Sequence, residues 1–339
     1  MSYSMSQSPV RIGVLGLIHD HVWDHLPQLV HSENAELVGA FDTNQALRER
    51  IQSDYGCPVY ETPEELLSEQ ELDGVFIFSS NKAGAELTLL ALERGLHVMI
   101  EKPMAASLAQ AEAMLAAAQA EDLCLMVNWP FAWWPQMQHA ITLAKAGGIG
   151  DLWQVKYRAA HAGPKELGCS DYFCEWLFDA ELNGAGAMMD YCCYGCVLAS
   201  NLLGEPDSVT GLGGQYRPAP LGVEDNALIV MQYPHGIATA EGSWSQVGKL
   251  TAYATAIYGT EGTLIVEPHK KGRLMLATEN EPLGTGVKVE CPVLTLQTAT
   301  EHFAHCIRTG ETPWELCDPK ISLSAQQILE RGVQQLQQS

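Results

Sequence analysis

The sequence predicts an α/β protein with two parts. Over residues 10–127, short apolar stretches alternate with helical segments, which is typical of a doubly wound parallel sheet covered by helices. After residue 127 the β-type stretches become longer and are joined by short turns, which predicts a second α/β domain with a large open, mostly antiparallel sheet. With 339 residues the chain is long enough to bury two cores.

The first part opens with the apolar run 10–17, whose glycine near the end suits a central strand that enters a tight turn. Pro63 favours the first turn of a helix, Gly95 the end of one, and Ser107 the N-cap of an Ala-rich helix. Residues 72–78 are rich in β-branched and aromatic side chains, which favours a strand. After the first strand the predicted elements are, in order, helix 21–31, strand 35–41, a helix from Asn44, strand 59–60, helix 63–68, strand 72–78, helix 83–94, strand 96–100, helix 107–120 and strand 123–127.

The C-terminal domain is predicted to comprise residues 128–339, and residues 1–9 a flexible tail. Its helices are predicted at 136–146, 188–203, 298–309 and 321–337, and the last helices are expected to pack back on the first domain. Its β-type stretches are 151–160, 207–216, 225–233, 236–245, 251–259, 262–267, 273–278 and 286–296.

Composition and charge exclude several classes of partner. The formal net charge is −22. Nucleic-acid phosphates and anionic membranes bind basic surfaces, so we expect neither nucleic acid nor a membrane as a partner. No apolar run is long enough to span a membrane, and the first residues lack the pattern of a signal peptide. We therefore expect a cytoplasmic protein whose ten cysteines are reduced. The cluster Cys192, Cys193 and Cys196 is interpreted as buried thiols, with a redox or metal role as the alternative.

The turn after the first strand is where a Rossmann dinucleotide-binding domain holds a pyrophosphate on a helix N-terminus. It has only the first glycine of the G-x-G-x-x-G pattern, and the predicted cofactor contacts in it are Gly16, Leu17, Ile18 and His19. The side chains of His19, Asp20 and His21 either supply donors in place of the missing glycines or cap the helix. A metal site formed by His19 and His21 is a less favoured alternative, so no metal is predicted.

Asp42 ends the second strand, where a carboxylate accepts hydrogen bonds from the adenosine ribose and repels a 2′-phosphate. This position predicts NAD rather than NADP as cofactor, and the alternative is a turn residue that caps the next helix. Ser79 and Asn81 follow the fourth strand, and together with Glu101 and Lys102 they complete the predicted cofactor site.

Lys102 directly follows a buried strand and precedes a proline, at the sheet edge where ligands bind. A positive charge there lowers the pKa of a nearby hydroxyl or holds a sugar oxygen. The alternative is a surface lysine in a loop.

The segment from Asn183 to Gly195 is a glycine-rich turn that opens a helix. In it Asp190 and Tyr194 are four residues apart and therefore share one helical face. A carboxylate that binds hydroxyls beside a phenol that passes a proton suits an alcohol substrate. The alternative is a carboxylate near a helix start and a tyrosine of the core.

The stretches Glu101-Lys102-Pro103 and Gly184 to Tyr194, in this order, resemble the Gfo/Idh/MocA oxidoreductase family (glucose–fructose oxidoreductase, inositol dehydrogenase and relatives). The resemblance implies a Rossmann domain followed by a substrate and oligomerisation domain, a nicotinamide cofactor, a sugar or cyclitol-like substrate, and a homodimer or homotetramer. By position, Lys102 matches the catalytic lysine and Asp190 the substrate-binding aspartate.

Tyr194 stands where this family usually has a catalytic histidine. An unperturbed tyrosine has a pKa of about 10, so we hypothesise that Lys102 lowers this value and that Tyr194 takes the substrate proton. Trp129, Trp133 and His161 are predicted to line the substrate pocket, with packing as the alternative for the tryptophans. The predicted function is that of an NAD-dependent dehydrogenase acting on a polyol or sugar. The alternatives are a redox-assisted glycosidase and a non-catalytic sensor of dinucleotide or sugar.

Overall fold

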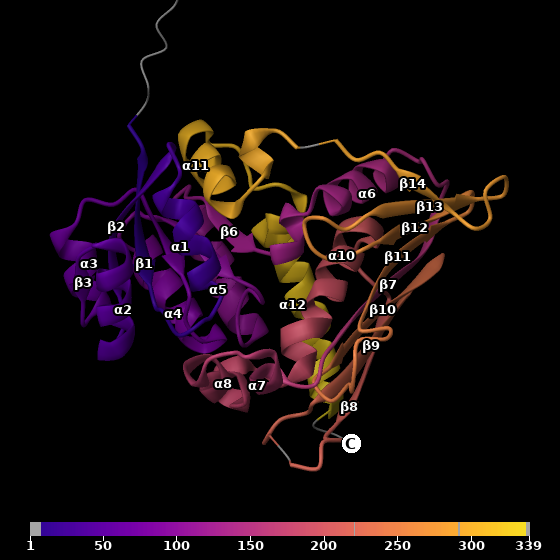
Figure 1. Cartoon of the computed structure of the whole chain (residues 1–339), viewed down its shortest axis with the longest axis horizontal. Helices are drawn as coiled ribbons and strands as arrows, with labels where there is room; N and C mark the ends of the chain where they lie inside the picture. The colour runs from indigo at the N-terminus through magenta and orange to yellow at the C-terminus, as the bar shows by residue number, and fades with distance from the viewer. Residues whose placement is uncertain (1–7, 220, 291, 337–339) are drawn as a thin grey trace, which may run out of the picture.

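Two sheets organise the computed structural model, which describes residues 8–219, 221–290 and 292–336. The N-terminal sheet and its helices lie on one side of the molecule and the larger C-terminal sheet on the other, with α10 (Cys193–Leu203) and α12 (Pro319–Leu336) between them (Figure 1). Residues 1–7 of the predicted tail lie outside the described part of the chain.

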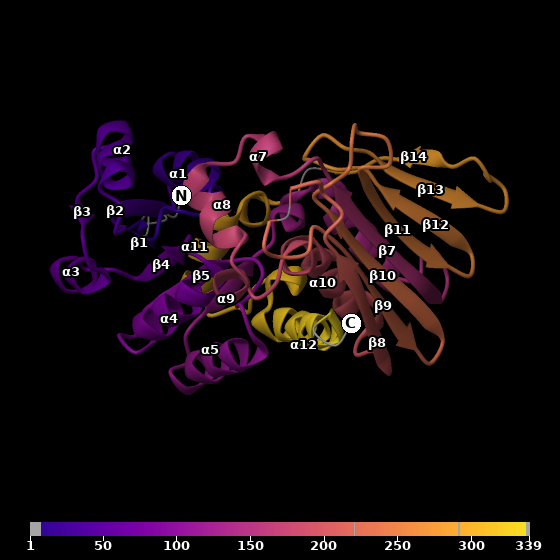
Figure 2. The same cartoon turned by 90° about the horizontal axis from the view of Figure 1, so that it is seen from below.

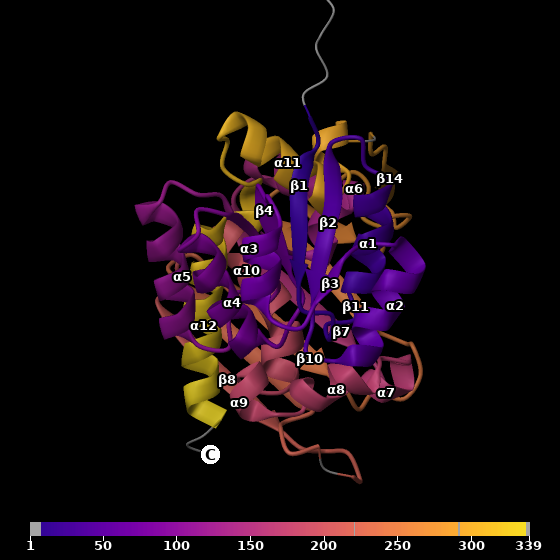
Figure 3. The same cartoon turned by 90° about the vertical axis from the view of Figure 1, so that its left-hand side faces the viewer.

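The first sheet has six parallel strands in the order β3-β2-β1-β4-β5-β6, which is the strand order of a Rossmann domain. Figure 3 views this part of the molecule from the side of β1 and β2. Its elements are β1 (Val10–Leu15), α1 (Val22–Val30), β2 (Ala35–Phe41), α2 (Gln45–Tyr55), β3 (Val59–Tyr60), α3 (Pro63–Glu69), β4 (Gly74–Ile77), α4 (Asn81–Leu92), β5 (His97–Glu101), α5 (Leu108–Ala120) and β6 (Leu125–Asn128).

The strand order reverses between β1 and β4, and this position determines where a ligand binds. In open α/β sheets, ligands occupy the crevice beyond the carboxyl ends of the strands at such a switch point. Gly16 follows β1, Ser79 lies just beyond β4, and Lys102 follows β5, so these residues share one edge of the sheet.

The second sheet has eight strands in the order β14-β13-β12-β11-β7-β10-β9-β8, and only the β7–β10 pair is parallel. Seen from below, it curves around α10 and α12 with one face toward these helices (Figure 2). The elements after β6 are η1 (Pro130–Trp133), α6 (Pro135–Lys145), β7 (Leu152–Ala160), α7 (Pro164–Leu167), α8 (Asp171–Leu177), α9 (Ala180–Asn183), η2 (Met188–Cys192), α10, β8 (Ser208–Gly214), β9 (Asn226–Tyr233), β10 (Gly236–Ser243), β11 (Tyr253–Gly259), β12 (Gly262–Val266), β13 (Leu274–Thr278), β14 (Thr285–Val287), η3 (Leu294–Leu296), α11 (Ala299–Thr309), η4 (Glu315–Cys317) and α12.

The predicted fold class is confirmed, and two local predictions need correction. The strand predicted over 286–296 is wrong for the described residues 288–290 and 292–296, because β14 is a short edge strand paired only with β13 and residues 294–296 form a 3₁₀ turn. Residue 291 lies outside the described part of the chain. The short helices α7, α8 and α9 were not predicted. Each is at most seven residues long, which is too short for a helix to be stable by itself, so its folding depends on what it packs against.

The C-terminal helices join the two sheets. The indole nitrogen of Trp129, just after β6, donates to the Ser322 hydroxyl of α12 at 3.1 Å. Glu301 of α11 accepts hydrogen bonds from Ser32 (2.6 Å) and Asn34 (2.8 Å), which follow α1. Among the described residues, no helix is both long and apolar enough to cross a membrane.

Candidate active site

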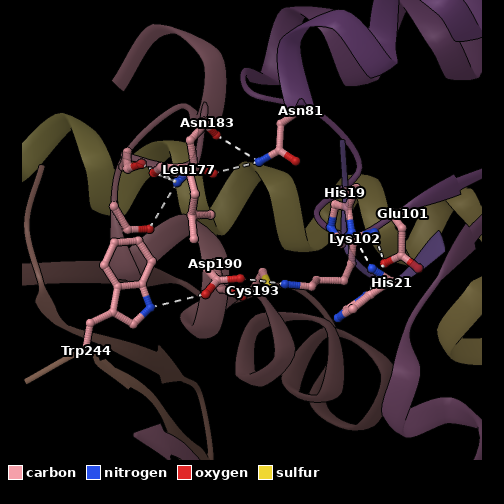
Figure 4. Close-up of polar contacts among 12 residues, drawn as sticks. His19, His21, Asn81, Glu101, Lys102, Leu177, Asn183, Asp190, Cys193 and Trp244 are labelled. Atoms are coloured by element: carbon pink, nitrogen blue, oxygen red, sulfur yellow. Dashed lines mark hydrogen bonds and ion pairs between the residues drawn. The ribbon is translucent and has the colours of Figure 1, made fainter. Parts of the chain in front are cut away.

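A buried ion pair joins the two parts of the molecule. The Nζ atom of Lys102 lies 2.6 Å from Oδ1 of Asp190, and the indole nitrogen of Trp244 donates to the other carboxylate oxygen at 3.2 Å (Figure 4). Lys102 is 4% exposed and Asp190 7%. Burial opposes the positive charge of Lys102, but the Asp190 carboxylate outweighs it and the pKa of this lysine is raised. Lys102 is therefore a permanent cation held in place by Asp190, not a surface lysine.

Asp190 is positioned by a π-helical turn, η2, which precedes α10. Gly184 begins this segment with a φ of +100°, and a Cβ there would collide with the Ala106 backbone, so the turn requires glycine. The Glu224 carboxylate then accepts hydrogen bonds from the N–H groups of Gly186 and Met188 at 2.8 and 2.9 Å. Wide π turns occur frequently at functional sites, and this one turns the Asp190 carboxylate toward Lys102.

Tyr194 lies one helical turn after Asp190, within a cluster of aromatic rings. It stacks on Tyr157 with centroids 5.5 Å apart, and the Lys102 Nζ lies 5.1 Å from the centroid of its ring. The side chain is 7% exposed, and no described residue hydrogen-bonds its hydroxyl. The structure thus brings Lys102, Asp190 and Tyr194 together.

The expectation that Lys102 lowers the pKa of Tyr194 is wrong. Burial, followed by the nearby Cys193 thiol and carboxylate charges, raises the pKa of Tyr194 well above its ordinary value. The charge of Lys102 is paired with Asp190 and lies over the ring of Tyr194, so it does not offset burial.

The first turn combines a glycine that the fold requires with two free backbone donors. Gly16 has a φ of +87°, and a Cβ there would lie 2.9 Å from the Phe78 carbonyl oxygen. The N–H groups of Ile18 and Asp20 have no hydrogen-bond partner among the described residues, and both precede α1. Two unpaired donors before a helix N-terminus fit a bound diphosphate.

Asp42, which follows β2, is hydrogen-bonded to this turn. Its Oδ2 accepts the N–H of Leu17 at 2.6 Å, and its Oδ1 accepts the N–H of Asn44 at 2.7 Å. The residue is 3% exposed. Asp42 therefore holds the turn in shape and also places a negative charge beside it. It does not cap α2, whose N-cap is Asn44, and its contact with the adenosine ribose stays a prediction.

A segment of the second part covers His19. The rings of Phe173 and Trp176, on α8, lie 4.9 and 5.6 Å from the His19 ring. The Asp20 carboxylate accepts the Ser170 hydroxyl at 2.6 Å and the Ser170 N–H at 2.7 Å. The predicted phosphate turn is thus latched to the start of α8, a contact between residues 150 positions apart that no local pattern in the sequence indicates.

Glu101 is buried, and its Oε2 accepts the backbone N–H of Lys102 at 3.2 Å. Its Oε2 lies 3.1 Å from Nδ1 of His21, and its Oε1 accepts the Asn128 side-chain N–H and lies 3.6 Å from Nε2 of His25. Burial acts to raise the pKa of Glu101, but the neighbouring imidazoles, His21 first, outweigh it and lower it. Burial also lowers the pKa of His25, to about 4.

The remaining predicted site residues have different surroundings. Asn81 donates to the backbone and side-chain oxygens of Asn183 at 3.0 and 2.8 Å, so its amide joins the two parts of the molecule. Ser79 is partly exposed at the carboxyl end of β4 and stays a candidate cofactor contact. Trp129 and Trp133 are 1% and 5% exposed, and their indole nitrogens donate to Ser322 and Asn128, so these contacts show packing, while a place in the substrate pocket stays a prediction.

One ring nitrogen of His161 is already hydrogen-bonded to the backbone. Its Nδ1 accepts the N–H of Gly163 at 2.9 Å, which assigns the proton of the neutral ring to Nε2. Burial lowers the pKa of His161, so the ring is a hydrogen-bond donor through Nε2. Its ring centroid lies 5.2 Å from that of Tyr191, the residue after Asp190.

Sequence reasoning missed Trp244 as a partner of the site. The Ser243-Trp244 pair follows β10, and only the parallel pairing of β10 with β7 carries the indole to Asp190. Cys193, predicted to be a buried thiol, donates to the Asp190 carbonyl at 3.0 Å and is fully enclosed.

The fold and the site define an NAD(P)-binding oxidoreductase. Residues 10–129 match the model of an oxidoreductase family with an NAD-binding Rossmann fold, and residues 137–265 match the GFO/IDH/MocA C-terminal domain. The chain belongs to the Gfo/Idh/MocA oxidoreductase family, as the resemblance of its motifs indicated.

Individual relatives span most of the chain. The protein is 28% identical to D-xylose 1-dehydrogenase (NADP(+)) 2 of Haloferax volcanii, over 89% of this chain and 90% of that one. It is 28% identical to trans-1,2-dihydrobenzene-1,2-diol dehydrogenase of Xenopus laevis, over 82% of each chain. The crystal structure of an inositol dehydrogenase homologue from Azotobacter vinelandii, complexed with NAD⁺, superposes with a TM-score of 0.84 at 18% identity, over 99% of this chain and 97% of that one. That last similarity shows the fold.

Proposed function

We propose that the protein transfers hydride between NAD and a carbon of a sugar or cyclic polyol. The observation that carries this proposal is the buried Lys102–Asp190 pair with the Tyr194 ring against it, at the carboxyl end of β5 beside the switch point of the sheet. When bound, the nicotinamide exchanges hydride with the substrate carbon. The residues must then bind the substrate oxygen and handle its proton.

Lys102 supplies the fixed positive charge. An oxygen that gains negative charge as the C–H bond breaks is stabilised by a preorganised cation in a site that excludes water. Because Asp190 and Trp244 hold the ammonium group through a chain of hydrogen bonds, it does not need to reorient during the reaction. The lone pairs of Asp190 that these bonds leave free can accept a second substrate hydroxyl.

Tyr194 is proposed as the proton carrier, in the direction that its pKa favours. A phenol whose pKa is raised stays protonated at neutral pH and donates its proton to the oxygen of a carbonyl substrate. Carbonyl reduction by this protein therefore proceeds at neutral pH, and alcohol oxidation accelerates as the pH rises. The donor Nε2 of His161 is a second candidate contact for a substrate oxygen.

The proposed substrate carries neighbouring hydroxyl groups. The two curated relatives are named for D-xylose and for a ring diol, both of which have adjacent oxygens. A substrate of this kind can place one oxygen on Lys102 and the next on Asp190, whose charged atoms are 2.6 Å apart.

We propose NAD in preference to NADP. The Asp42 carboxylate lies at the end of β2, and a 2′-phosphate bound beyond this strand would be repelled by it. One of the relatives is named for NADP⁺, so this choice must be tested in this chain. The protein is titrated with NAD⁺, NADP⁺ and their reduced forms in a calorimeter. NAD⁺ and NADH should bind more tightly than NADP⁺ and NADPH. Equal affinities, or a preference for NADP that Asp42→Ala does not change, would contradict the assignment.

The catalytic proposal is tested with Tyr194→Phe and a panel of sugars, cyclitols and their ketones. This variant keeps the ring and its packing but removes the hydroxyl, so we expect kcat for ketone reduction to fall by about 10²–10⁴-fold with unchanged NAD affinity. Full turnover by Tyr194→Phe would refute the proton role. Cleavage of a glycoside with no net NADH formation would instead favour the redox-assisted glycosidase, and tight NAD binding without turnover would favour a sensor.

We further propose a cytoplasmic homo-oligomer that uses the uncovered face of the second sheet. Three residues in register mark this face: Lys156 on β7, Thr239 on β10 and Val230 on β9. Their neighbours along each strand are buried against the helices. A dimer or tetramer in light scattering after size-exclusion chromatography is expected. A monomer at micromolar concentration would overturn this.

A further inference from the structure

A cluster of imidazoles and one carboxylate lies at the carboxyl ends of β1 and β5, next to the lysine but separate from its ion pair. His19 and His21 come from the first turn, and Glu101 comes from the last position of β5 (Figure 4). One ligand atom from each of these three residues lies within 4.8 Å of the other two. We propose that His19, His21 and Glu101 bind one divalent transition-metal ion of the zinc or cobalt type.

The spacing of the ligand atoms fits such an ion after small side-chain movements. Ligands at about 2.0–2.1 Å from a tetrahedral zinc are roughly 3.3 Å from one another. The His21 Nδ1 and Glu101 Oε2 atoms are already 3.1 Å apart. His21 has a side chain that is 32% exposed, so its ring can turn, whereas the other two residues are fixed by burial.

An unpaired buried nitrogen belongs to this cluster. Nε2 of His19 is sealed from solvent and has no hydrogen-bond partner among the described residues. Leaving a buried polar atom unpaired costs about 1–3 kcal/mol, and such atoms in a native fold point to a missing partner.

The charge of Glu101 also points to a cation. A buried carboxylate is costly unless a positive charge compensates it. The nearest lysine, Lys102, is committed to Asp190, and the side chains that face the Glu101 carboxylate are the His21 and His25 imidazoles and the Asn128 amide. A divalent ion held between Glu101 and the two histidines would supply that charge.

Residues behind the ligands provide the support that metal sites usually have. The Asn128 side chain donates to Oε1 of Glu101, and its own oxygen accepts the Trp133 indole N–H at 2.7 Å. Hydrogen bonds of this kind fix the orientation of a ligating carboxylate. Two imidazoles and a carboxylate leave one position open, toward the exposed side of His21, and this ligand set prefers zinc-type ions to magnesium or calcium.

The test uses the full-length protein, stripped with a chelator and titrated with Zn²⁺ and Co²⁺ by calorimetry and absorption spectroscopy. The matched variants are His21→Ala and Glu101→Gln, and the control is His235→Ala, which removes an exposed imidazole from the β9–β10 turn. We expect one ion per chain, an affinity at least roughly 100-fold weaker in His21→Ala and Glu101→Gln, and no change in His235→Ala. Thermal unfolding checks that each variant is folded.

A gain-of-signal variant keeps the proposal falsifiable if those variants fail to fold. His21→Cys replaces one ligand by a thiolate, so cobalt binding should produce a thiolate-to-cobalt charge-transfer band that the wild type lacks. No stoichiometric binding by the wild type, equal binding by His21→Ala, or no new band in His21→Cys would each overturn the site. The metal site does not rest on the proposed dehydrogenase activity. NAD binding by the stripped protein is measured in a separate titration, so a failure of metal binding and a failure of NAD binding can be told apart.

Discussion

Breaking the Lys102–Asp190 pair tests whether the site is organised as the structure shows. The perturbation is Lys102→Met, which keeps the length of the side chain and removes its charge. Asp190 is then left as a buried carboxylate whose remaining side-chain hydrogen bond comes from Trp244 at 3.2 Å. Asp190→Leu is the reciprocal change, and the double variant replaces the pair by two apolar side chains.

The expected cost follows from the distance and the burial. At 2.6 Å and an effective dielectric constant of 20, the attraction between unit charges is about 6 kcal/mol, against a desolvation cost of several kcal/mol for each ion. The intact pair therefore contributes little net stability. Removing one partner should cost about 3–5 kcal/mol, while the double variant should lie within about 1 kcal/mol of the wild type or above it.

The assay is urea unfolding at pH 7, followed by tryptophan fluorescence and circular dichroism. The matched control is Lys82→Met, which breaks an exposed ion pair with Glu181 and should change the free energy of unfolding by less than about 1 kcal/mol. A loss below about 1 kcal/mol in Lys102→Met, or a double variant as unstable as the two single variants combined, would refute the buried pair.

Three further predictions concern the surroundings of the site. Gly16→Ala should lower the free energy of unfolding and weaken NAD binding, because its Cβ would meet the Phe78 backbone. Gly56→Ala is the control: Gly56 has a similar positive φ but open space around it, so the change should cost only about 1–2 kcal/mol and leave NAD affinity unchanged. Equal effects of the two variants on NAD affinity would contradict this. Asp20→Ala should speed hydrogen exchange in the segment that starts at Ser170 and raise both the on-rate and off-rate of NAD, and unchanged exchange there would show that the latch is unimportant. The pKa of His25 is about 4 in the folded protein and about 6.5 in the unfolded chain, so the unfolded state binds more protons between these values and about 3 kcal/mol of stability is lost as the pH falls from 6.5 to 4. In urea titrations over this range His25→Gln should lose less stability than the wild type. An unchanged dependence of stability on pH would refute the assignment to His25.

Part of the site follows from local sequence, because its chemistry is carried by short segments. A lysine directly after a buried strand of a parallel sheet must lie at the ligand edge, so Lys102 was predictable. The four-residue spacing likewise predicted that Asp190 and Tyr194 share a face, and the π turn at 188–192 preserves this relation. Buried tryptophans were not distinguishable from pocket tryptophans, since the sequence does not reveal that Trp129 bonds to Ser322 of the last long helix.

The sequence by itself determined the fold class, the family and the identity of the residues that can handle a proton, because strand periodicity, glycine turns and the Glu-Lys-Pro motif are local properties. Only the tertiary structure decided what these residues do to one another. It paired Lys102 with Asp190, 88 positions away, and so removed the cation that was expected to lower the pKa of Tyr194. It also carried Glu101 to His21, 80 positions away, and so created a ligand set that two histidines alone do not provide. Burial and distance set these charges, and both depend on how segments remote in the chain pack together.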